Sequence, residues 1–357
     1  MIVIKGQYIS KNESIIIQSI AVMLMVFHHL FGFPERINSD YIIVSDFSFL
    51  HIGTILSYCG RICIGIFAFN SGYGMYKKLN SFTYSSYFDV LKKGYGCILR
   101  QLKNFYVRYW IVFFAFIPLG IIFGRFKFNL NNFLLSLIGY TSPYNAEWWY
   151  VKYYCIFMLI LPVLYLIDYF LNKKVHYIVT SIIYVMLFVL FTVFYDKLLF
   201  IENFAVYLCF LSGMACVSLN LFDNLENLYI KMRWVKYLIA IVLILSVVIL
   251  RIVFSSDCTY DYLFMPVLVF NICIFLKSGI FKKTVNKVLF FIGRYSMYIW
   301  LTHTFFAYYY FQSFIYFFRY SILIFIVCML YSLACGIVLD FIHKKVSALF
   351  LRKDKRT

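Results

Sequence analysis

The feature that most constrains the fold is a series of ten apolar runs separated by short polar and basic segments. A helix of about 20 mainly apolar residues is long enough to cross the hydrocarbon core of a bilayer. The runs lie at roughly 14–33, 52–76, 106–124, 148–171, 177–195, 200–219, 237–254, 262–276, 289–312 and 320–342. With 64% hydrophobic and only 13% charged residues, the chain is also far more apolar than a soluble domain. We therefore expect an all-α integral membrane protein, a bundle of about ten transmembrane helices in which residues 1–357 form one membrane domain.

The basic residues predict how the chain is oriented in the lipid bilayer. The 33 Lys and Arg residues give a formal net charge of +18, but they lie in clusters between the apolar runs. The pairs at 77–78, 92–93 and 173–174 all fall on one side of the membrane if the N-terminus is inside. Since Lys and Arg gather on the cytoplasmic side of membrane proteins, both termini are expected in the cytoplasm. The charge thus indicates membrane topology and no nucleic-acid partner.

The cysteines and the first apolar run indicate neither a metal site nor a cleaved leader. The ten cysteines lie mostly within apolar runs, and the pair Cys59 and Cys63 falls inside one such run. We expect reduced cysteines that pack among apolar side chains, and no structural metal. No small-residue cleavage site follows the first run, so we expect a retained span and not a signal peptide.

Ionisable side chains inside predicted spans are the first candidates for a functional site, because burying them in a bilayer is costly. His28 and His29 lie near the end of the first run. Glu147 lies directly before the fourth run, and His303 lies past the middle of the ninth. A helix that leaves the cytoplasm near Ser14 raises His29 by roughly 20 Å, into the outer third of the bilayer. His29, Glu147 and His303 are therefore expected to share the outer half of the membrane.

Four segments, in this order along the chain, resemble a known family. They are "QSIAVMLMVFHH" at 18–29, "GIFAFNSGYGMYKK" at 65–78, "WWYVKYY" at 148–154 and "IGRYSMYIWLTH" at 292–303. The chain resembles the membrane-bound acyltransferase family 3, the sugar O-acetyltransferases of bacterial membranes. In that family the first span carries an Arg followed, after ten residues, by a His. The second span carries an aromatic-rich run that ends in Ser-Gly-Phe/Tyr, and a late span carries Ser-Tyr-x-x-Tyr-Leu-x-His.

The resemblance implies site positions and also departs from the family at one of them. His29 and His303 take the positions of the family's two histidines. The second-span motif falls on Ser71, Gly72 and Tyr73. The family's arginine is replaced by Gln18, which lies eleven residues before His29 and so on the same helix face, about 16 Å away. An uncharged Gln18 cannot hold an anion, so any phosphate-binding role of that arginine would have to move, to Arg61 or Arg100.

The chemistry of acetyl transfer suggests roles for the candidate catalytic residues. Transfer from a thioester to a sugar hydroxyl needs a base for the hydroxyl proton, and an imidazole suits that role. We predict that His29 is the general base and that Glu147 orients its ring, with His28 and His303 as further catalytic candidates. The alternatives are a capped helix-end histidine at the lipid interface for His29 and packing or hydrogen bonding to a neighbour for His28. For Glu147 the alternative is an ordinary interface position beside two tryptophans, and for His303 a buried hydrogen-bonded helix contact.

The expected acyl donor, acetyl-CoA, is a cytoplasmic anion. Cations at the inner mouth of the bundle could attract its phosphates, and small residues could let the thin pantetheine arm pass between helices. The donor-binding candidates are Arg61, Ser71, Gly72, Tyr73, Arg100 and Lys103. For these the alternatives are a buried ion pair, close helix packing through small residues, and topology anchors. If donor and base lie on opposite sides of the midplane, a channel should run from segment 77–108 to His29.

Taken together, the resemblance and the polar residues predict an integral O-acyltransferase of the bacterial cytoplasmic membrane. It would move an acetyl group from acetyl-CoA to a hydroxyl of a surface or lipid-linked polysaccharide, such as a capsule or exopolysaccharide. Members with an extracytoplasmic esterase-like domain pass the acyl group to it; this chain shows none, so direct acylation of the glycan is expected. The alternatives are a polysaccharide flippase or other secondary transporter, and a non-catalytic scaffold or sensor. The sugar, its hydroxyl and the oligomeric state stay open.

Overall fold

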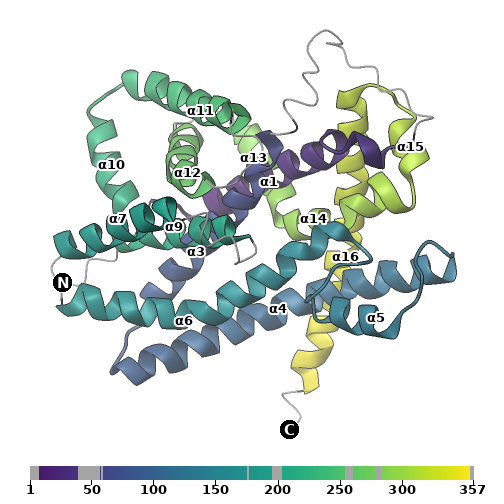
Figure 1. The fold of residues 1–357 in the computed structure, drawn as a ribbon, viewed down its shortest axis with the longest axis horizontal. Helices are drawn as coiled ribbons and strands as arrows, with labels where there is room; N and C mark the ends of the chain where they lie inside the picture. The colour runs from purple at the N-terminus through teal and green to yellow at the C-terminus, as the bar shows by residue number, and fades with distance from the viewer. Residues whose placement is uncertain are drawn as a thin grey trace. The chain divides into compact units, whose positions relative to one another are not determined.

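Helices make up the described part of the chain in this computed structural model (Figure 1). The structure describes residues 8–38, 57, 59–174, 177–194, 203–253, 260–278 and 283–353, and no β-strand occurs among them. Each of the ten apolar runs contains helix within this part of the chain. The predicted all-α class is therefore confirmed.

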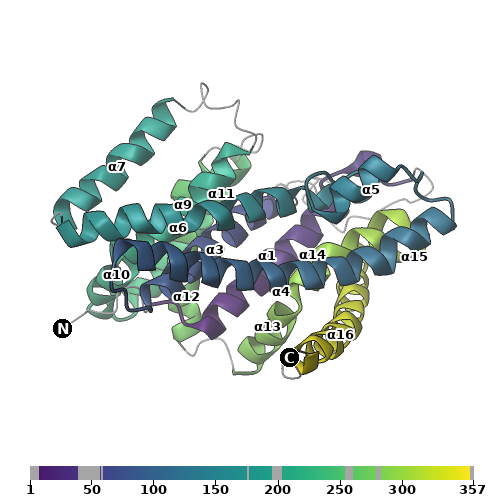
Figure 2. The ribbon, with the colours of Figure 1, turned by 90° about the horizontal axis from the view of Figure 1, so that it is seen from below.

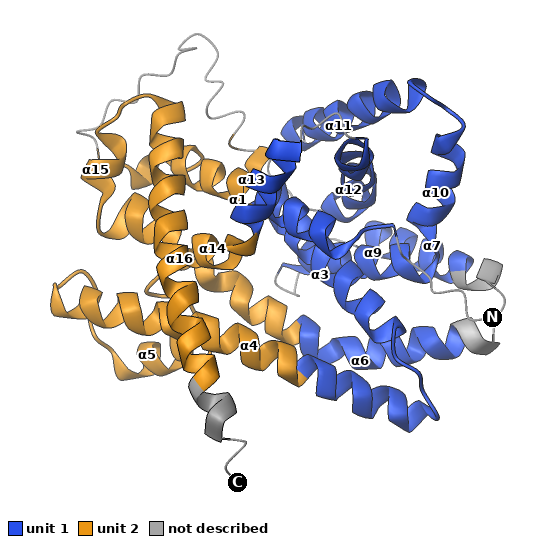
Figure 3. Cartoon of the chain, turned by 180° about the vertical axis from the view of Figure 1, so that it is seen from behind, with its two compact units in different colours: residues 1–21, 61–98, 157–293 blue, residues 22–60, 99–156, 294–357 orange. Residues whose placement is uncertain are grey.

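The contacts along the chain divide it into two compact units, coloured separately in Figure 3. Unit 1 contains residues 1–21, 61–98 and 157–293. Unit 2 contains residues 22–60, 99–156 and 294–357. Each unit is thus assembled from three separate segments of the sequence, and each is described by itself below. That residues 1–357 form a single membrane domain stays a prediction.

Unit 1 is built around α9 (Phe204–Ser218), which packs against α3 (Ile62–Asn80) and α12 (Asp261–Lys277), as Figures 1 and 2 show. The helix α11 (Val235–Val253) packs on α12. Two further helices lie wholly in this unit, α7 (Tyr177–Val193) and α10 (Leu221–Ile230). All of α13 (Lys283–Arg294) except its last residue also belongs to it.

Two glycines set the close approach of α3 and α9. A Cβ atom added to Gly72 would lie inside the van der Waals radius of the Phe210 carbonyl oxygen. In the same way, a Cβ atom added to Gly213 would collide with the Phe69 carbonyl oxygen. Because glycine has no side chain, the two helix backbones can touch at these positions. The small residues of the second apolar run therefore form a helix–helix contact.

The first helix, α1 (Lys11–Phe31), begins with a reciprocal cap. The Ser10 amide donates to Glu13 Oε2 at 2.7 Å, and the Glu13 amide donates to Ser10 Oγ at 3.2 Å. This capping box satisfies two backbone donors that would otherwise lack partners at the start of a helix. Gln18, where the family has arginine, lies half-buried on α1.

Unit 2 contains the end of α1 and a group of helices from the last part of the chain. α14 (Ser296–Thr304) packs against α16 (Ser321–Lys353). A π-helical turn, η3 (Phe305–Tyr309), follows α14 directly and leads to α15 (Gln312–Tyr316). The shorter elements of this unit are η1 (Pro34–Arg36), α5 (Leu130–Leu137) and η2 (Ala146–Trp149). The long helices α4 (Tyr87–Ile122) and α6 (Tyr150–Lys174) carry residues of both units.

Several helices are long and apolar enough to cross a membrane. In the described chain, five helical segments meet this condition: Lys11–Phe31, Tyr87–Ile122, Ala146–Leu171, Val235–Val253 and Ser321–Ala348. A pair bent by 63°, Phe204–Ser218 with Leu221–Ile230, would give a sixth. The chain is therefore a multi-pass membrane protein by length and composition. The ninth apolar run is divided among α13, α14 and the π-helical turn, which a count of apolar residues cannot foresee. The number of ten spans stays a prediction, and the two chain ends lie outside the described residues.

Candidate active site

Three of the four predicted catalytic residues meet in unit 2. The end of α1 supplies His29, η2 supplies Glu147 and α14 supplies His303. His29 Nδ1 lies 2.7 Å from His303 Nε2, and His29 Nε2 lies 2.9 Å from Glu147 Oε2. The two imidazoles and the carboxylate thus form one chain of hydrogen bonds with His29 in the middle.

Arg36 extends this chain and was not foreseen from the sequence. Its Nη1 lies 2.7 Å from Glu147 Oε1, so the carboxylate joins an imidazole on one oxygen and a guanidinium on the other. Burial alone would lower the pKa of Arg36, but the hydrogen bond to Glu147 and its negative charge offset this, and the pKa lies above its usual value. One signal in the sequence could have pointed to Arg36. It is a basic residue seven positions after His29, on the predicted outer side of the membrane, where the positive-inside rule predicts few basic residues.

The partners of each nitrogen determine where the protons lie. His303 Nδ1 faces two carbonyl oxygens, of Ile299 at 3.0 Å and of Trp300 at 2.8 Å, which can only accept. His303 Nδ1 therefore carries a hydrogen, and in a neutral ring its Nε2 accepts from His29 Nδ1. A third proton is needed between His29 Nε2 and Glu147. The chain therefore holds one proton more than two neutral imidazoles and an ionised carboxylate would carry.

Solvent exposure differs along this hydrogen-bonded chain of side chains. His303 is fully buried, whereas His29 and Glu147 each keep 8% of their surface exposed. The Arg36 side chain is 36% exposed. The exposed surface of the hydrogen-bonded chain therefore lies at its Glu147 and Arg36 end, and His303 contributes none.

Asn145, two residues before Glu147, holds Glu147 in place. Asn145 caps η2 because its Oδ1 accepts from the Glu147 amide at 3.2 Å. The Asn145 Nδ2 donates to Thr304 Oγ1 at 2.8 Å, one residue after His303. The same buried amide thus positions the carboxylate and ties η2 to the end of α14.

Two tryptophans add a reciprocal connection between η2 and α14. Trp148 Nε1 donates to the Leu301 carbonyl at 3.0 Å, and Trp300 Nε1 donates to the Glu147 carbonyl at 3.1 Å. Indole rings are rigid, and each buried N–H needs an acceptor. Trp148, the first residue of the segment "WWYVKYY", therefore helps to fix Glu147 against the helix that carries His303.

The end of α1 is fixed by residues that follow α14. Tyr308, in the π-helical turn, donates its hydroxyl hydrogen to the His29 carbonyl. Tyr316 does the same to the Leu30 carbonyl at 2.9 Å, and Gln312 Nε2 donates to the Arg36 carbonyl at 2.8 Å. The last carbonyls of a helix have no partner within the helix, so Tyr308 and Tyr316 satisfy two of them at the end of α1 and hold His29 in position. Gln312 fixes η1, which follows α1. π-helical turns inside helices are frequent at functional sites.

His28 lies beside this chain but has different partners. Its Nδ1 lies 2.7 Å from the Ser57 carbonyl oxygen, so Nδ1 donates. Its ring meets Phe33 edge-on, with centroids 5.0 Å apart, and Gly60 packs against its Cβ. These contacts are those of the packing alternative, and a catalytic role for His28 stays a prediction.

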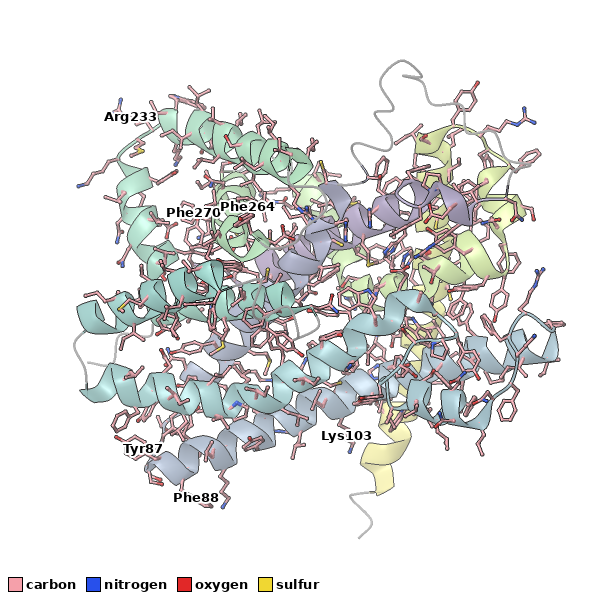
Figure 4. The ribbon with its side chains drawn as sticks, viewed as in Figure 1. Tyr87, Phe88, Lys103, Arg233, Phe264 and Phe270 are labelled. Atoms are coloured by element: carbon pink, nitrogen blue, oxygen red, sulfur yellow. The ribbon has the colours of Figure 1, made fainter. Side chains whose placement is uncertain are left out.

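The donor-binding candidates fall in both units. Arg61 precedes α3 in unit 1, and Ser71, Gly72 and Tyr73 lie within that helix. Arg100 and Lys103 are exposed on α4 in unit 2, where Figure 4 labels Lys103.

Two of these candidates already have packing partners. Gly72 touches α9, and the Tyr73 hydroxyl accepts from the Ile9 amide at 3.3 Å while its ring stacks on Phe222. Donor binding by the six candidates, and a channel from segment 77–108 to His29, stay predictions. Among the described residues, no group of three or more His, Cys, Asp or Glu side chains is placed to hold a metal ion.

Apolar helices and a partly buried chain of imidazoles and a carboxylate define a multi-pass membrane protein with an acid–base centre. Residues 13–341 match the model of a family described as an acyltransferase domain, acyltransferase family 3. The chain belongs to this family, which confirms the resemblance seen in the sequence and makes the protein a membrane acyltransferase. Comparison with curated proteins and with solved structures gave no significant match.

Proposed function

We propose that the protein is an O-acetyltransferase of the bacterial cytoplasmic membrane. It transfers the acetyl group of cytoplasmic acetyl-CoA to a hydroxyl of a surface or lipid-linked polysaccharide. The observation that carries this proposal is the hydrogen-bonded chain His303–His29–Glu147–Arg36. A transfer from thioester to hydroxyl needs a positioned base, and this chain places an imidazole with a polar partner on each nitrogen.

His29 Nε2 is the basic atom in this mechanism. Because His303 Nε2 accepts from His29 Nδ1, the lone pair of a neutral His29 ring lies on Nε2. His303 is fully buried, so it acts on His29 and not on a substrate. His303 thus orients the base, the role that a carboxylate has in a Ser-His-Asp triad and that we had expected of Glu147.

Glu147 occupies the position that an acceptor hydroxyl needs. In the resting arrangement both nitrogens of His29 are engaged, so the proton shared with Glu147 must stay on Glu147 when that side chain moves away. His29 is then neutral, with the lone pair on Nε2. The acceptor hydroxyl then takes the place of Glu147 at Nε2, and Arg36 retains the displaced carboxyl group through Oε1.

The bond changes balance without a further reactant. The acceptor oxygen bonds to the thioester carbonyl carbon while its proton passes to His29 Nε2. The carbon–sulfur bond then breaks, and the sulfur of CoA takes up that proton and leaves as the thiol. The products are an acetylated glycan and free CoA, with His29 neutral again.

The test uses purified full-length protein in detergent, supplied with acetyl-CoA and a glycan extract of the producing cell. Free CoA thiol and acetyl groups on the glycan are both measured. Replacing His29 with Ala should lower transfer by about 10²-fold or more, since general-base catalysis contributes that much. The matched control is Glu35→Gln, on an exposed residue of η1, which should keep wild-type activity.

Two outcomes would overturn the proposal. Full transfer by the His29→Ala variant would remove His29 from the mechanism. Movement of labelled glycan across proteoliposomes without release of CoA would favour the alternative of a polysaccharide transporter.

A further inference from the structure

Unit 1 contains a half-open cavity of about 250 Å³ that the chemistry described above does not use. It lies where α10 and α12 end and α11 begins, and Tyr8 closes one side. Ligand pockets commonly measure about 300–1,000 Å³. The cavity is therefore large enough for part of a cofactor-sized molecule and too small for all of one.

Aromatic rings form one wall of this cavity. The Tyr8 ring stacks on Phe270, with centroids 5.0 Å apart, and Tyr229 meets Phe270 edge-on at 5.2 Å. Tyr237 lines the cavity from the start of α11. Tyr8 and Phe270 are buried and cover each other, whereas Tyr229 and Tyr237 keep part of their surface exposed. Exposed tyrosine rings can bind a planar heterocycle by stacking, and their hydroxyl groups offer hydrogen bonds at its edge.

Positive charge lies beside the aromatic wall. Lys277 Nζ lies 3.3 Å from the centre of the Tyr8 ring and 3.4 Å from Glu226 Oε1. Lys236 Nζ lies 5.1 Å from the centre of the Tyr237 ring. Since Glu226 balances only one of the two ammonium groups, the cavity has a net positive charge and favours an anion.

The surroundings of the cavity strengthen this preference. Lys231 and Arg233 lie in the turn between α10 and α11, and Figure 4 labels Arg233 there and Phe270 on α12. Basic residues at the ends of apolar helices are predicted on the cytoplasmic side. The cavity therefore combines aromatic stacking with phosphate attraction on the side where nucleotides occur.

We propose that this cavity binds the nucleotide end of the acyl donor. The purine ring lies against Tyr229 and Tyr237, and the phosphates lie near Lys236 and the basic turn. This inference rests on the proposed function for the identity of the donor. It places the nucleotide on residues other than the six donor-binding candidates of the sequence.

The probe for the test is adenosine 3′,5′-bisphosphate, a nucleotide without an acyl group. Its binding to the purified full-length protein is measured by calorimetry for the wild type and for Lys236→Gln and Tyr229→Leu. Both variants should weaken binding by about tenfold, as expected for the loss of one charge-assisted contact or one stacking ring. Lys92→Gln, on an exposed lysine of α4, is the matched control and should bind like the wild type.

Kinetics provide the second readout, and each outcome has a meaning. In Lys236→Gln the KM for acetyl-CoA should rise by the same factor while kcat stays within twofold, which also shows that the variant is folded. His29→Ala should bind the bisphosphate normally, so loss of transfer and loss of nucleotide binding are separable. Unchanged binding of the bisphosphate in both cavity variants would overturn the inference. So would displacement of the bisphosphate by phosphatidylglycerol vesicles that occurs in the wild type and is lost in Lys236→Gln. Nucleotide binding without any transferase activity would keep the cavity and reject the proposed function.

Discussion

At the scale of single residues, the proximity of three candidate residues was predictable, and the direct contacts between them were not. The rise per residue of a helix placed His29, Glu147 and His303 in the same half of the bilayer, and the structure brings their side chains together. That His303 and not Glu147 faces His29 Nδ1 depends on how α1 and α14 are rotated about their axes. Arg36 lies beyond the apolar run, where hydropathy carries no signal.

The positioning role of His303 can be tested by two substitutions of different chemistry. Gln at this position can still accept a hydrogen bond from His29 Nδ1, whereas Leu fills the space and cannot. We expect His303→Leu to lower kcat by about 10²-fold or more with little change in KM, and His303→Gln to restore part of the loss. Steady-state kinetics of both variants check this. Equal activity of the two variants would contradict it, because packing alone would then explain His303.

At the scale of helices, the apolar runs predicted where helices occur, and interruptions were harder to see. The ninth run continues through Arg294, Tyr295 and Ser296, and the structure divides it there into α13 and α14. Apolar length cannot separate one straight span from two helices joined by a bend. The capping box at Ser10 and Glu13, in contrast, is a local pattern that could be read from the sequence.

Two glycines of α3 provide a matched pair for testing the contact with α9. Gly72→Ala should destabilise the protein by about 1–3 kcal/mol, because its Cβ would meet the Phe210 carbonyl and the helices would have to separate. Gly74→Ala is the control, since nothing lies within 4 Å of its added Cβ. It should be neutral or stabilise the helix by up to about 1 kcal/mol. Thermal unfolding of the purified variants measures both, and an equally stable Gly72→Ala variant would contradict the packing role.

At the scale of the whole molecule, composition predicted the fold class correctly, and the orientation inferred from the distribution of charge stays a prediction. The apolar helices and the family match agree with an all-α membrane acyltransferase. How the chain gathers into two compact units could not be predicted, because each unit draws on three distant segments. Hydropathy reports on each segment separately and contains no information on which segments pack together.

The expected location of both termini gives a test at this scale. With a positive-inside arrangement, a green fluorescent protein fused to the C-terminus should fold and fluoresce in the cytoplasm. An alkaline phosphatase fused at the same place should be inactive, because that enzyme requires the outer compartment to form its disulfides. The opposite pair of results would reverse the predicted topology and place His29 near the inner surface.

The hydrogen bonds on both nitrogens of His29 also affect how fast water hydrolyses the acyl donor. An enzyme that binds a reactive thioester where water can enter risks hydrolysing it. Because both nitrogens of His29 are hydrogen-bonded, His29 cannot act as a base for a water molecule. We therefore expect CoA release without glycan to be at least about tenfold slower than with it. Replacing Glu147 with Ala should increase the rate of CoA release without glycan and so bring it closer to the rate with glycan. A thiol assay in the absence of acceptor measures this increase. Rapid CoA release by the wild type in the absence of glycan would contradict this. With the expected result, the Glu147 carboxylate keeps His29 inactive until an acceptor hydroxyl displaces it.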